Sequence, residues 1–295
     1  MNNISWRHHY IPEFYLKGFT NNTGKFKIFD VDRQQFIKHG KEFSTESYFF
    51  EEDGNTLVNE DGASDFIEGI YSKTDDRISK LFDKIRNANP NTRFGLTEDD
   101  MPALQHFVSI MFWRLPINYD QVKHLIKEKD LRELGLLIKS TETGEVLQNS
   151  AFELKLKNDP NFFKALKQIL PNLTYKRIFD CKTPLTIRPF PDGLPSLCSD
   201  NPIIFEKASF PDVYFDDFIF PLTNKLVFIR GKRINEDVMT SNKISIDLIL
   251  LKQAKKYVSC TDELYIQLLN DHYNKHYKSI DELKSSVFTT LIAKQ

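Results

Sequence analysis

Residues 184–230 read PLTIRPFPDGLPSLCSDNPIIFEKASFPDVYFDDFIFPLTNKLVFIR and hold seven of the 13 prolines in the chain. Proline fixes φ and has no backbone N–H, so this density excludes long helices and favours short strands with tight connections. We predict strands at residues 184–188, 196–198, 202–206, 217–221 and 225–230, with a turn at residues 222–224. The sequence therefore predicts a β-rich section over about residues 180–260.

The chain before this section supplies a hairpin and then helices. Residues 25–38 alternate apolar and polar side chains around the turn-like run VDRQQ, which predicts a β-hairpin. Apolar residues recur at helical spacing over about residues 62–178. An isolated hairpin is marginally stable, so it needs strand partners from the C-terminal half. We therefore predict an α+β fold, in which a mixed or antiparallel sheet from both ends of the chain packs on a central helical bundle.

Composition limits the classes of function. The chain has 295 residues, 40% of them hydrophobic, so it can bury a sizeable core. Its 40 basic and 41 acidic residues leave a net charge of −1, so any nucleic-acid site must be a local cleft. Three widely spaced cysteines, Cys181, Cys198 and Cys260, argue against a disulfide framework. We see neither a secretory signal nor an apolar run of membrane-spanning length, and expect a cytoplasmic protein with no membrane partner and an oligomeric state that the sequence leaves open.

Two adjacent histidines mark the first candidate motif, RHHYIPEFYL at residues 7–16. His8 and His9 precede a helix that begins near Pro12, and in an extended backbone they point to opposite sides. Histidine at such a place can bind a metal, carry a proton or contact a phosphate. The structural alternative is that one histidine caps the helix and the other is solvated.

A polar turn between apolar segments is the second candidate, LCSDNPIIF at residues 197–205. Asp200 and Asn201 place a carboxylate and an amide in a tight turn, where they can present a fixed acid. The structural alternative is that Asp and Asn are common turn formers before proline, because their side chains bond to nearby backbone. We interpret Cys198, which follows Leu197 in an apolar strand, as a core residue rather than a nucleophile.

These motifs resemble a known family. The pattern His8-His9-Tyr10-Ile11-Pro12-x-Phe14-Tyr15-Leu16-x-x-Phe19 is similar to the opening motif of the bacterial domain of unknown function 4238 (DUF4238) family, and Ser199-Asp200-Asn201-Pro202 resembles its central motif. Segments ending in Arg114-Leu115-Pro116, at Pro221-Leu222-Thr223 and at residues 246–259 follow in the same order. The resemblance implies a bacterial, cytosolic protein but no settled activity. We predict a DUF4238-like domain over residues 1–260 and a C-terminal helical extension over residues 261–295.

The two motifs form one site if the N-terminal segment lies across the β section. Histidine and carboxylates can hold a divalent ion that activates water for attack on a phosphodiester. The predicted catalytic residues are His8, His9, Asp200 and Asn201, and the predicted ligands of Mg²⁺ or Mn²⁺ are His9, Asp200 and Glu13, with Glu68 as a further carboxylate. Arg7 and Arg114 are the predicted contacts to the substrate anion.

The leading hypothesis is a metal-assisted phosphodiester hydrolase, nuclease-like, that acts on nucleic acid as a toxin or phage-defence effector. The alternative is a non-catalytic binding or sensing module, in which both motifs lock the chain terminus onto the sheet. The two hypotheses differ at Asp200. Replacing it with Asn should abolish turnover in the enzyme and lower stability in the binding module.

Two further patterns have structural explanations that we favour. Basic residues at positions 155, 157, 164, 167, 176 and 177 alternate with Phe152, Phe162, Phe163 and Tyr175. They fit single-strand binding, but an amphipathic helix with a basic exposed face explains them better. His272 and His276 are four residues apart, as zinc ligands often are, but a solvated helix face is the better interpretation.

Overall fold

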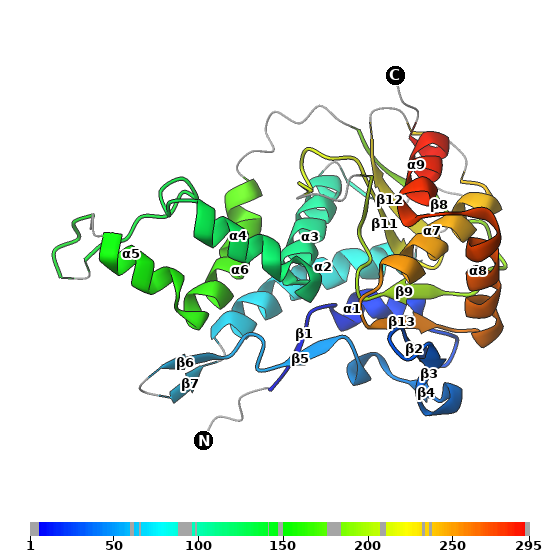
Figure 1. Ribbon diagram of the computed structural model, residues 1–295, viewed down its shortest axis with the longest axis horizontal. Coiled ribbons are helices and arrows are strands. Elements are labelled where there is room, and N and C mark those ends of the chain that lie inside the picture. The colour runs from blue at the N-terminus through cyan, green and yellow to red at the C-terminus, as the bar shows by residue number, and fades with distance from the viewer. Residues whose placement is uncertain are drawn as a thin grey trace.

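The computed structural model describes residues 6–59, 62–64, 66–87, 96–97, 99–140, 142–146, 150–175, 184–206, 211–231, 234–235 and 238–292. It confirms the predicted α+β fold (Figure 1). Every strand pairing in these ranges is antiparallel. The strands form two main sheets and two short ribbons rather than one sheet.

The first main sheet joins the two ends of the chain, as predicted. The N-terminal hairpin consists of β2 (Phe26–Asp30) and β3 (Gln35–Phe36). The strand order is β3-β2-β13-β9, with β4 (Glu42–Phe43) also on β2, so the hairpin pairs with β13 (Tyr257–Cys260) and through it with β9 (Leu197–Ser199). Residues near position 30 therefore lie beside residues near position 257.

The second main sheet is a buried layer between helices. Its strand order is β10-β11-β12-β8, with β8 (Leu185–Pro189), β10 (Ile204–Phe205), β11 (Phe218–Thr223) and β12 (Leu226–Arg230). Side chains alternate between two cores, because Phe218 and Phe220 join one hydrophobic cluster and Ile219 joins the other. Burial on both faces explains why β11 and β12 are apolar at nearly every position.

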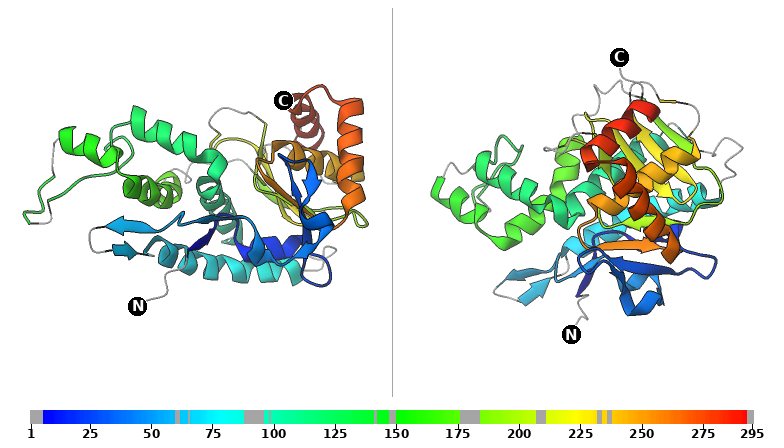
Figure 2. Two further views of the ribbon diagram at one scale, coloured as in Figure 1. Left: turned by 60° about the horizontal axis from the view of Figure 1, so that its bottom comes forward. Right: turned by 45° about the vertical axis from the view of Figure 1, so that its right-hand side comes forward.

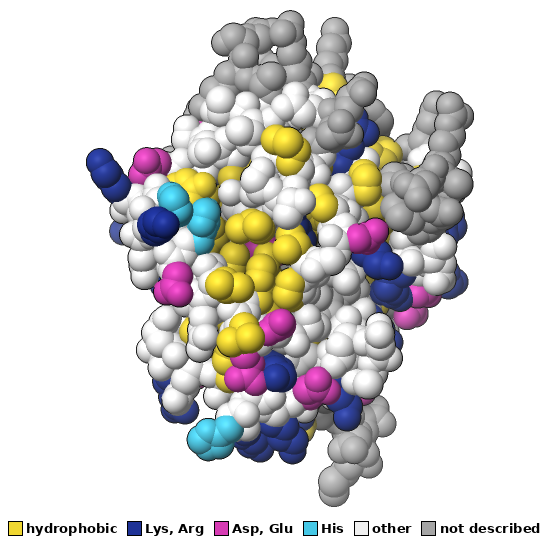
Figure 3. Space-filling model, turned by 90° about the vertical axis from the view of Figure 1, so that its right-hand side faces the viewer, with side chains coloured by type: hydrophobic (Ala, Val, Ile, Leu, Met, Phe, Trp, Pro, Cys, Tyr) yellow, Lys and Arg dark blue, Asp and Glu magenta, His cyan; other side chains and the backbone are white. Residues whose placement is uncertain are grey.

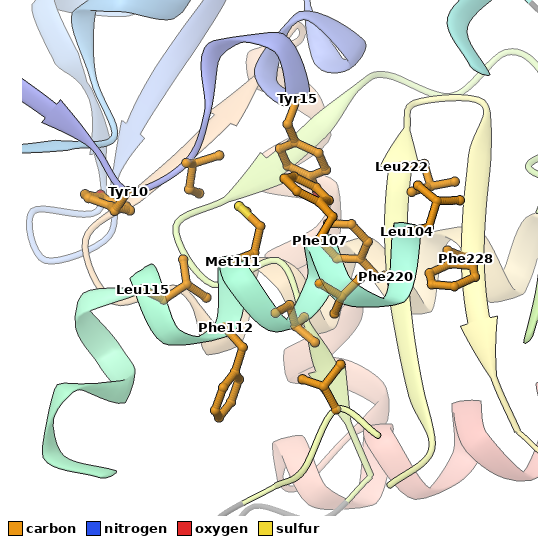
Figure 4. Packing of buried hydrophobic residues seen from close by; sticks show 14 of the residues in the cluster. Tyr10, Tyr15, Leu104, Phe107, Met111, Phe112, Leu115, Phe220, Leu222 and Phe228 are labelled. Carbon is orange, nitrogen blue, oxygen red and sulfur yellow. The ribbon is translucent and has the colours of Figure 1, made fainter. Parts of the chain in front are cut away.

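The N-terminal helix packs into the first core. It spans α1 (Glu13–Leu16), and Pro12 precedes it. Tyr15 is fully buried, stacks on Phe220 with ring centroids 5.2 Å apart, and donates its hydroxyl hydrogen to the Pro221 carbonyl at 2.8 Å. Phe107 of α3 (Asp100–Arg114) completes this contact (Figure 4). The family-like motif therefore anchors the chain terminus to the second main sheet.

Helices occupy both sides of the β structure. The middle of the chain forms α2 (Phe66–Asn87), α3, α4 (Tyr119–Glu128), α5 (Ser150–Lys157) and α6 (Pro160–Tyr175), of which α4, α5 and α6 extend away from the sheets (Figures 1 and 2). The C-terminal helices α7 (Thr240–Gln253), α8 (Glu263–His276) and α9 (Ile280–Leu291) build the second core. None of the helices in the described ranges combines the length and apolar character that a bilayer span requires.

Helix α8 also carries apolar side chains on its outer surface. Leu264 and Leu268, one helical turn apart, are exposed by 65% and 64%. Figure 3 shows apolar side chains gathered on the face of the molecule that carries this helix. This apolar surface lies away from α4, α5 and α6.

Candidate functional site

Strand β1 (Arg7–His9) positions the two histidines on opposite sides. It pairs with β5 (Phe50–Glu52), so that His8 lies opposite Glu51 and His9 opposite Phe50. Successive side chains of a strand point to opposite faces. His8 is buried, with 2% of its surface exposed, and His9 is partly exposed.

His8 is oriented by a backbone hydrogen bond. The Asn55 N–H donates to His8 Nδ1 at 3.1 Å, and the Asn55 side chain donates to Glu68 Oε2 at 2.9 Å. Because Nδ1 accepts a hydrogen bond, the neutral ring carries its proton on Nε2. Within the described part of the chain, Nε2 is buried and has no hydrogen-bond partner. His8 therefore presents an N–H donor rather than the free lone pair that a metal requires.

His9 faces carboxylates. Its Nδ1 lies 3.9 Å from Oε1 of Glu13, which follows four residues further along the chain. Burial lowers the pKa of His9 below its usual value, against the attraction of Glu13, while Arg114 lowers it further and Glu68 raises it. His9 is therefore a neutral imidazole at pH 7, within electrostatic reach of two carboxylates and one guanidinium.

Arg114, at the end of α3, joins three elements. It is 4% exposed, and its Nη1 donates to both carboxylate oxygens of Asp75 on α2, at 3.0 and 3.1 Å. Its Nη2 donates to the backbone oxygen of His9 at 2.9 Å, and the guanidinium lies 3.9 Å from the centre of the Tyr71 ring. Both terminal nitrogens are thus bonded within the protein, so Arg114 holds β1 against α2 and α3 instead of lying open to a substrate.

Arg7 is exposed at the surface of the same strand. Its guanidinium lies 4.5 Å from the centre of the Trp6 ring and 4.9 Å from that of Phe50. These contacts place a positive charge at the edge of the β1–β5 ribbon.

Three residues that the sequence analysis did not assign to this site adjoin it. Glu51, opposite His8, accepts a hydrogen bond from the Tyr119 hydroxyl. The Lys167 amine lies 4.0 Å from the centre of the Tyr119 ring. Burial lowers the pKa of Lys167 to about 8, against the attraction of Glu51, and burial also raises the pKa of Tyr119. These residues come from β5, α4 and α6, so only tertiary contact brings them together.

We call these residues together the N-terminal polar cluster. Its members are ionisable or hydrogen-bonding side chains around β1 and β5: His8, His9, Glu13, Glu51, Glu68, Asp75, Arg114, Tyr119 and Lys167. The pKa values of His9 and Lys167 are lowered and that of Tyr119 is raised. Groups with shifted pKa values concentrate at functional sites.

Asp200 is bonded to the backbone at the start of β13. It is 6% exposed, and its carboxylate accepts backbone N–H groups from Lys255 at 2.8 Å, Lys256 at 2.6 Å and Tyr257 at 3.0 Å. Burial raises the pKa of Asp200, and these three N–H groups oppose the shift. Within the described ranges, no hydrogen bond or ion pair joins Asp200 to His8 or His9. The direct His–Asp200 contact that we expected is therefore not formed.

Asn201 is likewise bonded to backbone. Its side-chain amide donates to the Gln253 carbonyl at 3.2 Å, and the Gln253 side chain donates to the Asn201 carbonyl at 2.6 Å. The Asp200-Asn201 turn thus fixes the end of α7 and the start of β13. This geometry matches the structural alternative stated for this motif.

The two motifs nevertheless meet through aromatic side chains. The Phe49 carbonyl accepts the N–H groups of Tyr10 and Ile11, at 3.0 and 3.4 Å. The Phe49 ring centre lies 6.4 Å from that of Tyr10 and 6.3 Å from that of Tyr257, whose N–H donates to Asp200. Tyr10, Phe49 and Tyr257 therefore connect the N-terminal motif to the Asp200 turn.

The predicted metal ligands are only partly together. His9 and Glu13 are neighbours, but Asp200 is bonded elsewhere. Across the residues that the structure describes, no group of three His, Cys, Asp or Glu side chains is arranged to hold an ion. His272 and His276 of α8 face each other with ring centroids 4.5 Å apart, without such a third ligand.

The basic and cysteine side chains considered above have structural contacts. Lys164 donates to the carbonyls of Asp53 and Thr56, and Lys157 donates to the Lys129 carbonyl. Positions 176 and 177 lie outside the described residues, as does Cys181. Cys198 is 1% exposed, and burial raises the pKa of its thiol, which suits a core residue.

Comparison with known proteins identifies the family. The search of curated proteins and the search of solved structures returned no match. The family model described as "Protein of unknown function (DUF4238)" matches residues 7–281, from the first strand into α9. With nearly all of its 295 residues matched, the chain belongs to the DUF4238 family of proteins of unknown function.

Proposed function

We propose that this chain is a phosphodiester hydrolase that acts on nucleic acid, with its reacting groups in the N-terminal polar cluster. The observation that carries the proposal is the state of His9, an imidazole kept neutral by burial while it lies 3.9 Å from the Glu13 carboxylate. A neutral histidine can take a proton from water, and an adjacent carboxylate stabilises the imidazolium that forms.

The reaction requires water to add to phosphorus and one P–O ester bond to break. His9 would accept the proton of the attacking water at Nδ1, the nitrogen nearest Glu13, because its Nε2 is buried. The leaving oxygen would take a proton from solvent. Arg114 acts as a positioning residue, because its Nη2 holds the His9 backbone oxygen at 2.9 Å. His8 lies on the opposite face of the strand from His9, and the N–H of its Nε2 is a buried donor there.

In this proposal the protein supplies only one or two of the ligands of a divalent ion. Mg²⁺ commonly binds one or two carboxylates and completes its shell with water and substrate phosphate oxygens. Glu13 is accessible, with 38% of its side chain exposed, and Glu68 also acts on His9. We therefore retain Glu13 and replace Asp200 with Glu68 among the proposed ligands of Mg²⁺ or Mn²⁺.

The test measures cleavage of end-labelled single-stranded DNA and RNA, with EDTA, Mg²⁺ or Mn²⁺. We expect His9→Gln to lower the rate by roughly 10²-fold or more, as loss of a general base does, and Glu13→Gln to weaken the response to metal. The matched control is His276→Gln, an exposed histidine on α8. Intact substrate under every ion, or full activity in His9→Gln, would refute the proposal.

A non-catalytic binding or sensing module is the second candidate. The observation that favours it is that Asp200 and Arg114 are both bonded within the protein, as locking residues would be. On this hypothesis Asp200→Asn lowers stability by about 2–4 kcal/mol, because an amide cannot accept all three buried N–H groups.

Thermal and urea unfolding of Asp200→Asn, together with its cleavage rate, separate the two candidates. Lower stability, with wild type showing neither turnover nor bound metal, favours the module. If Asp200→Asn is as stable as wild type but has lost turnover, Asp200 belongs to the catalytic site. Asp262→Asn, the exposed N-cap of α8, is a control of the same chemistry.

A further inference from the structure

A cavity of about 560 Å³ lies where the N-terminal hairpin meets the turn that Asp200 holds. It is separate from the His9 side chain and is lined by the end of β2, by β3, by the segment Ile37–Gly40, by Tyr48 and by the start of β13. Ligand sites for small molecules generally have volumes of this size, roughly 300–1,000 Å³.

The cavity has an excess of positive charge. Arg33, Lys38 and Lys256 line it, whereas Asp30 is the one carboxylate among its lining residues. Asp30 is occupied by its own turn, since Oδ1 accepts the Arg33 N–H at 2.9 Å and Oδ2 lies 3.8 Å from Arg33 Nε. Lys38 and Lys256 are exposed, and neither has a carboxylate partner within the described ranges. In a chain of net charge −1, this is the kind of local basic site that a small anion requires.

Aromatic rings form the remainder of the wall. The Tyr48 and Tyr257 rings meet edge to face with centroids 5.2 Å apart, and Phe36 lies on the hairpin side. The Lys256 amine is 4.9 Å from the centre of the Tyr257 ring. Flat rings beside ammonium groups can stack on a nucleobase while the cations bind a phosphate.

Both walls are held in fixed conformations. Lys38 and His39 have left-handed backbone angles, with φ of 49° and 54°, a conformation that L-residues rarely adopt and that concentrates at ligand sites. Across the cavity, the Asp200 carboxylate binds the N–H groups of Lys256 and Tyr257. The Asp200 motif thereby fixes two lining residues without touching the cavity itself.

We infer that this cavity binds a nucleoside phosphate, with the base against Tyr48 and Tyr257 and the phosphate on Lys38 and Lys256. Asp200 is a positioning residue for this site. The inference does not depend on the proposed hydrolase, because no residue of the N-terminal polar cluster lines the cavity.

Calorimetric titration of the full chain tests this site. The probes are the four 5′-nucleoside monophosphates, the matching nucleosides, inorganic phosphate, and an oligonucleotide with and without a 5′-phosphate. We expect nucleotides to bind roughly tenfold or more tightly than nucleosides or phosphate. A nucleoside lacks the phosphate contact to the lysines, and inorganic phosphate lacks the base contact to the tyrosines. The double variant Lys38→Gln/Lys256→Gln should weaken nucleotide binding by roughly tenfold or more, and Tyr48→Leu should do the same through the base.

The matched control is Lys275→Gln/Lys278→Gln, which removes two exposed lysines elsewhere. If only the 5′-phosphorylated oligonucleotide binds, the nucleoside phosphate that the cavity recognises is the 5′ end of a strand. This result also supports the site. The inference would be overturned if neither a nucleotide nor the 5′-phosphorylated oligonucleotide bound at millimolar concentration, if phosphate alone bound with equal affinity, or if the lysine variant kept its affinity. If Tyr48→Leu fails to fold, the surface lysine variant still carries the test.

Discussion

His9 is a partly buried ionisable residue and Lys167 a buried one, and burial lowers the pKa of each. Burial disfavours the charged form of each side chain, so each couples protonation to the stability of the fold. The two groups titrate in different ranges, which allows them to be measured separately.

His9 should make stability depend on pH below neutrality. Its pKa is lower in the folded protein than the ordinary value of 6.5, so the unfolded chain takes up the proton first as pH falls. The stability present above pH 6.5 is therefore lost as pH falls through the folded pKa. The free energy of unfolding of wild type should drop more between pH 7 and 5 than that of His9→Gln, as measured by urea unfolding. Identical pH profiles would contradict the buried, neutral state of His9.

Lys167 should have its effect in the alkaline range. Its pKa falls from 10.5 to about 8 on folding, so the folded protein gains stability as pH rises from 8 toward 10.5. A shift of this size corresponds to about 3 kcal/mol, and the side chain is 4% exposed. Lys167→Met should be more stable than wild type at pH 7, with a difference that shrinks by pH 10. Lys164→Met, which removes hydrogen bonds to two carbonyls, should instead be destabilised.

At the scale of elements, Arg114 ties α2, α3 and β1 together. Arg114→Met leaves Asp75 half-buried and unpaired, and should cost about 2–4 kcal/mol, because the remaining charge loses its partner. Asp75→Leu added to Arg114→Met should recover part of this loss. Urea unfolding of the two single variants and the double variant measures the coupling. Additive losses would contradict a direct Arg114–Asp75 interaction.

Sequence periodicity predicted those helices and strands whose apolar residues form a regular local pattern. The strands of residues 184–230 and the N-terminal hairpin were predicted because proline density and alternation are local signals. The turn expected at residues 222–224 begins later, since β11 continues to Thr223 through an irregularity in its pairing with β12. The left-handed backbone at Lys38 and His39 could not be predicted, because Lys seldom adopts that conformation and His adopts it in only a small share of cases.

The candidate site was predicted only in part, for a related reason. His9, Glu13, Glu68 and Arg114 were expected together and do act on one another. Asp200 was assigned to the same site because a carboxylate in a turn suits either chemistry or capping, and sequence cannot say which backbone N–H groups will reach it. Glu51, Tyr119 and Lys167 meet through three different elements, and no spacing along the chain indicates such contacts.

The C-terminal helices complete the second core. Leu283, Val287, Phe288 and Leu291 of α9 are each at most 2% exposed. Burying four such side chains contributes roughly 6–12 kcal/mol, which is similar to the roughly 5–15 kcal/mol that stabilises a whole domain.

Truncation tests whether residues 261–295 are an extension or part of the fold. A variant that ends at Lys278 should lose its cooperative thermal transition, because it lacks α9. A control that ends at Ile292 should melt like wild type. A cooperative transition near the wild-type temperature in the shorter variant would show that the domain is complete without α9.

Phe49 has a consequence that reaches beyond its own neighbours. Its backbone is left-handed, with φ of 63°; its carbonyl binds Tyr10 and Ile11, and its ring lies against Tyr257. A ligand that displaced Tyr48 or Tyr257 would disturb the contacts of Phe49. Because Phe49 also binds Tyr10 and Ile11, the strand that carries His9 would shift with it. Communication of this kind is reciprocal, so whatever occupies one region must alter the affinity of the other by the same factor. Two family motifs about 190 positions apart would then work as one allosteric unit.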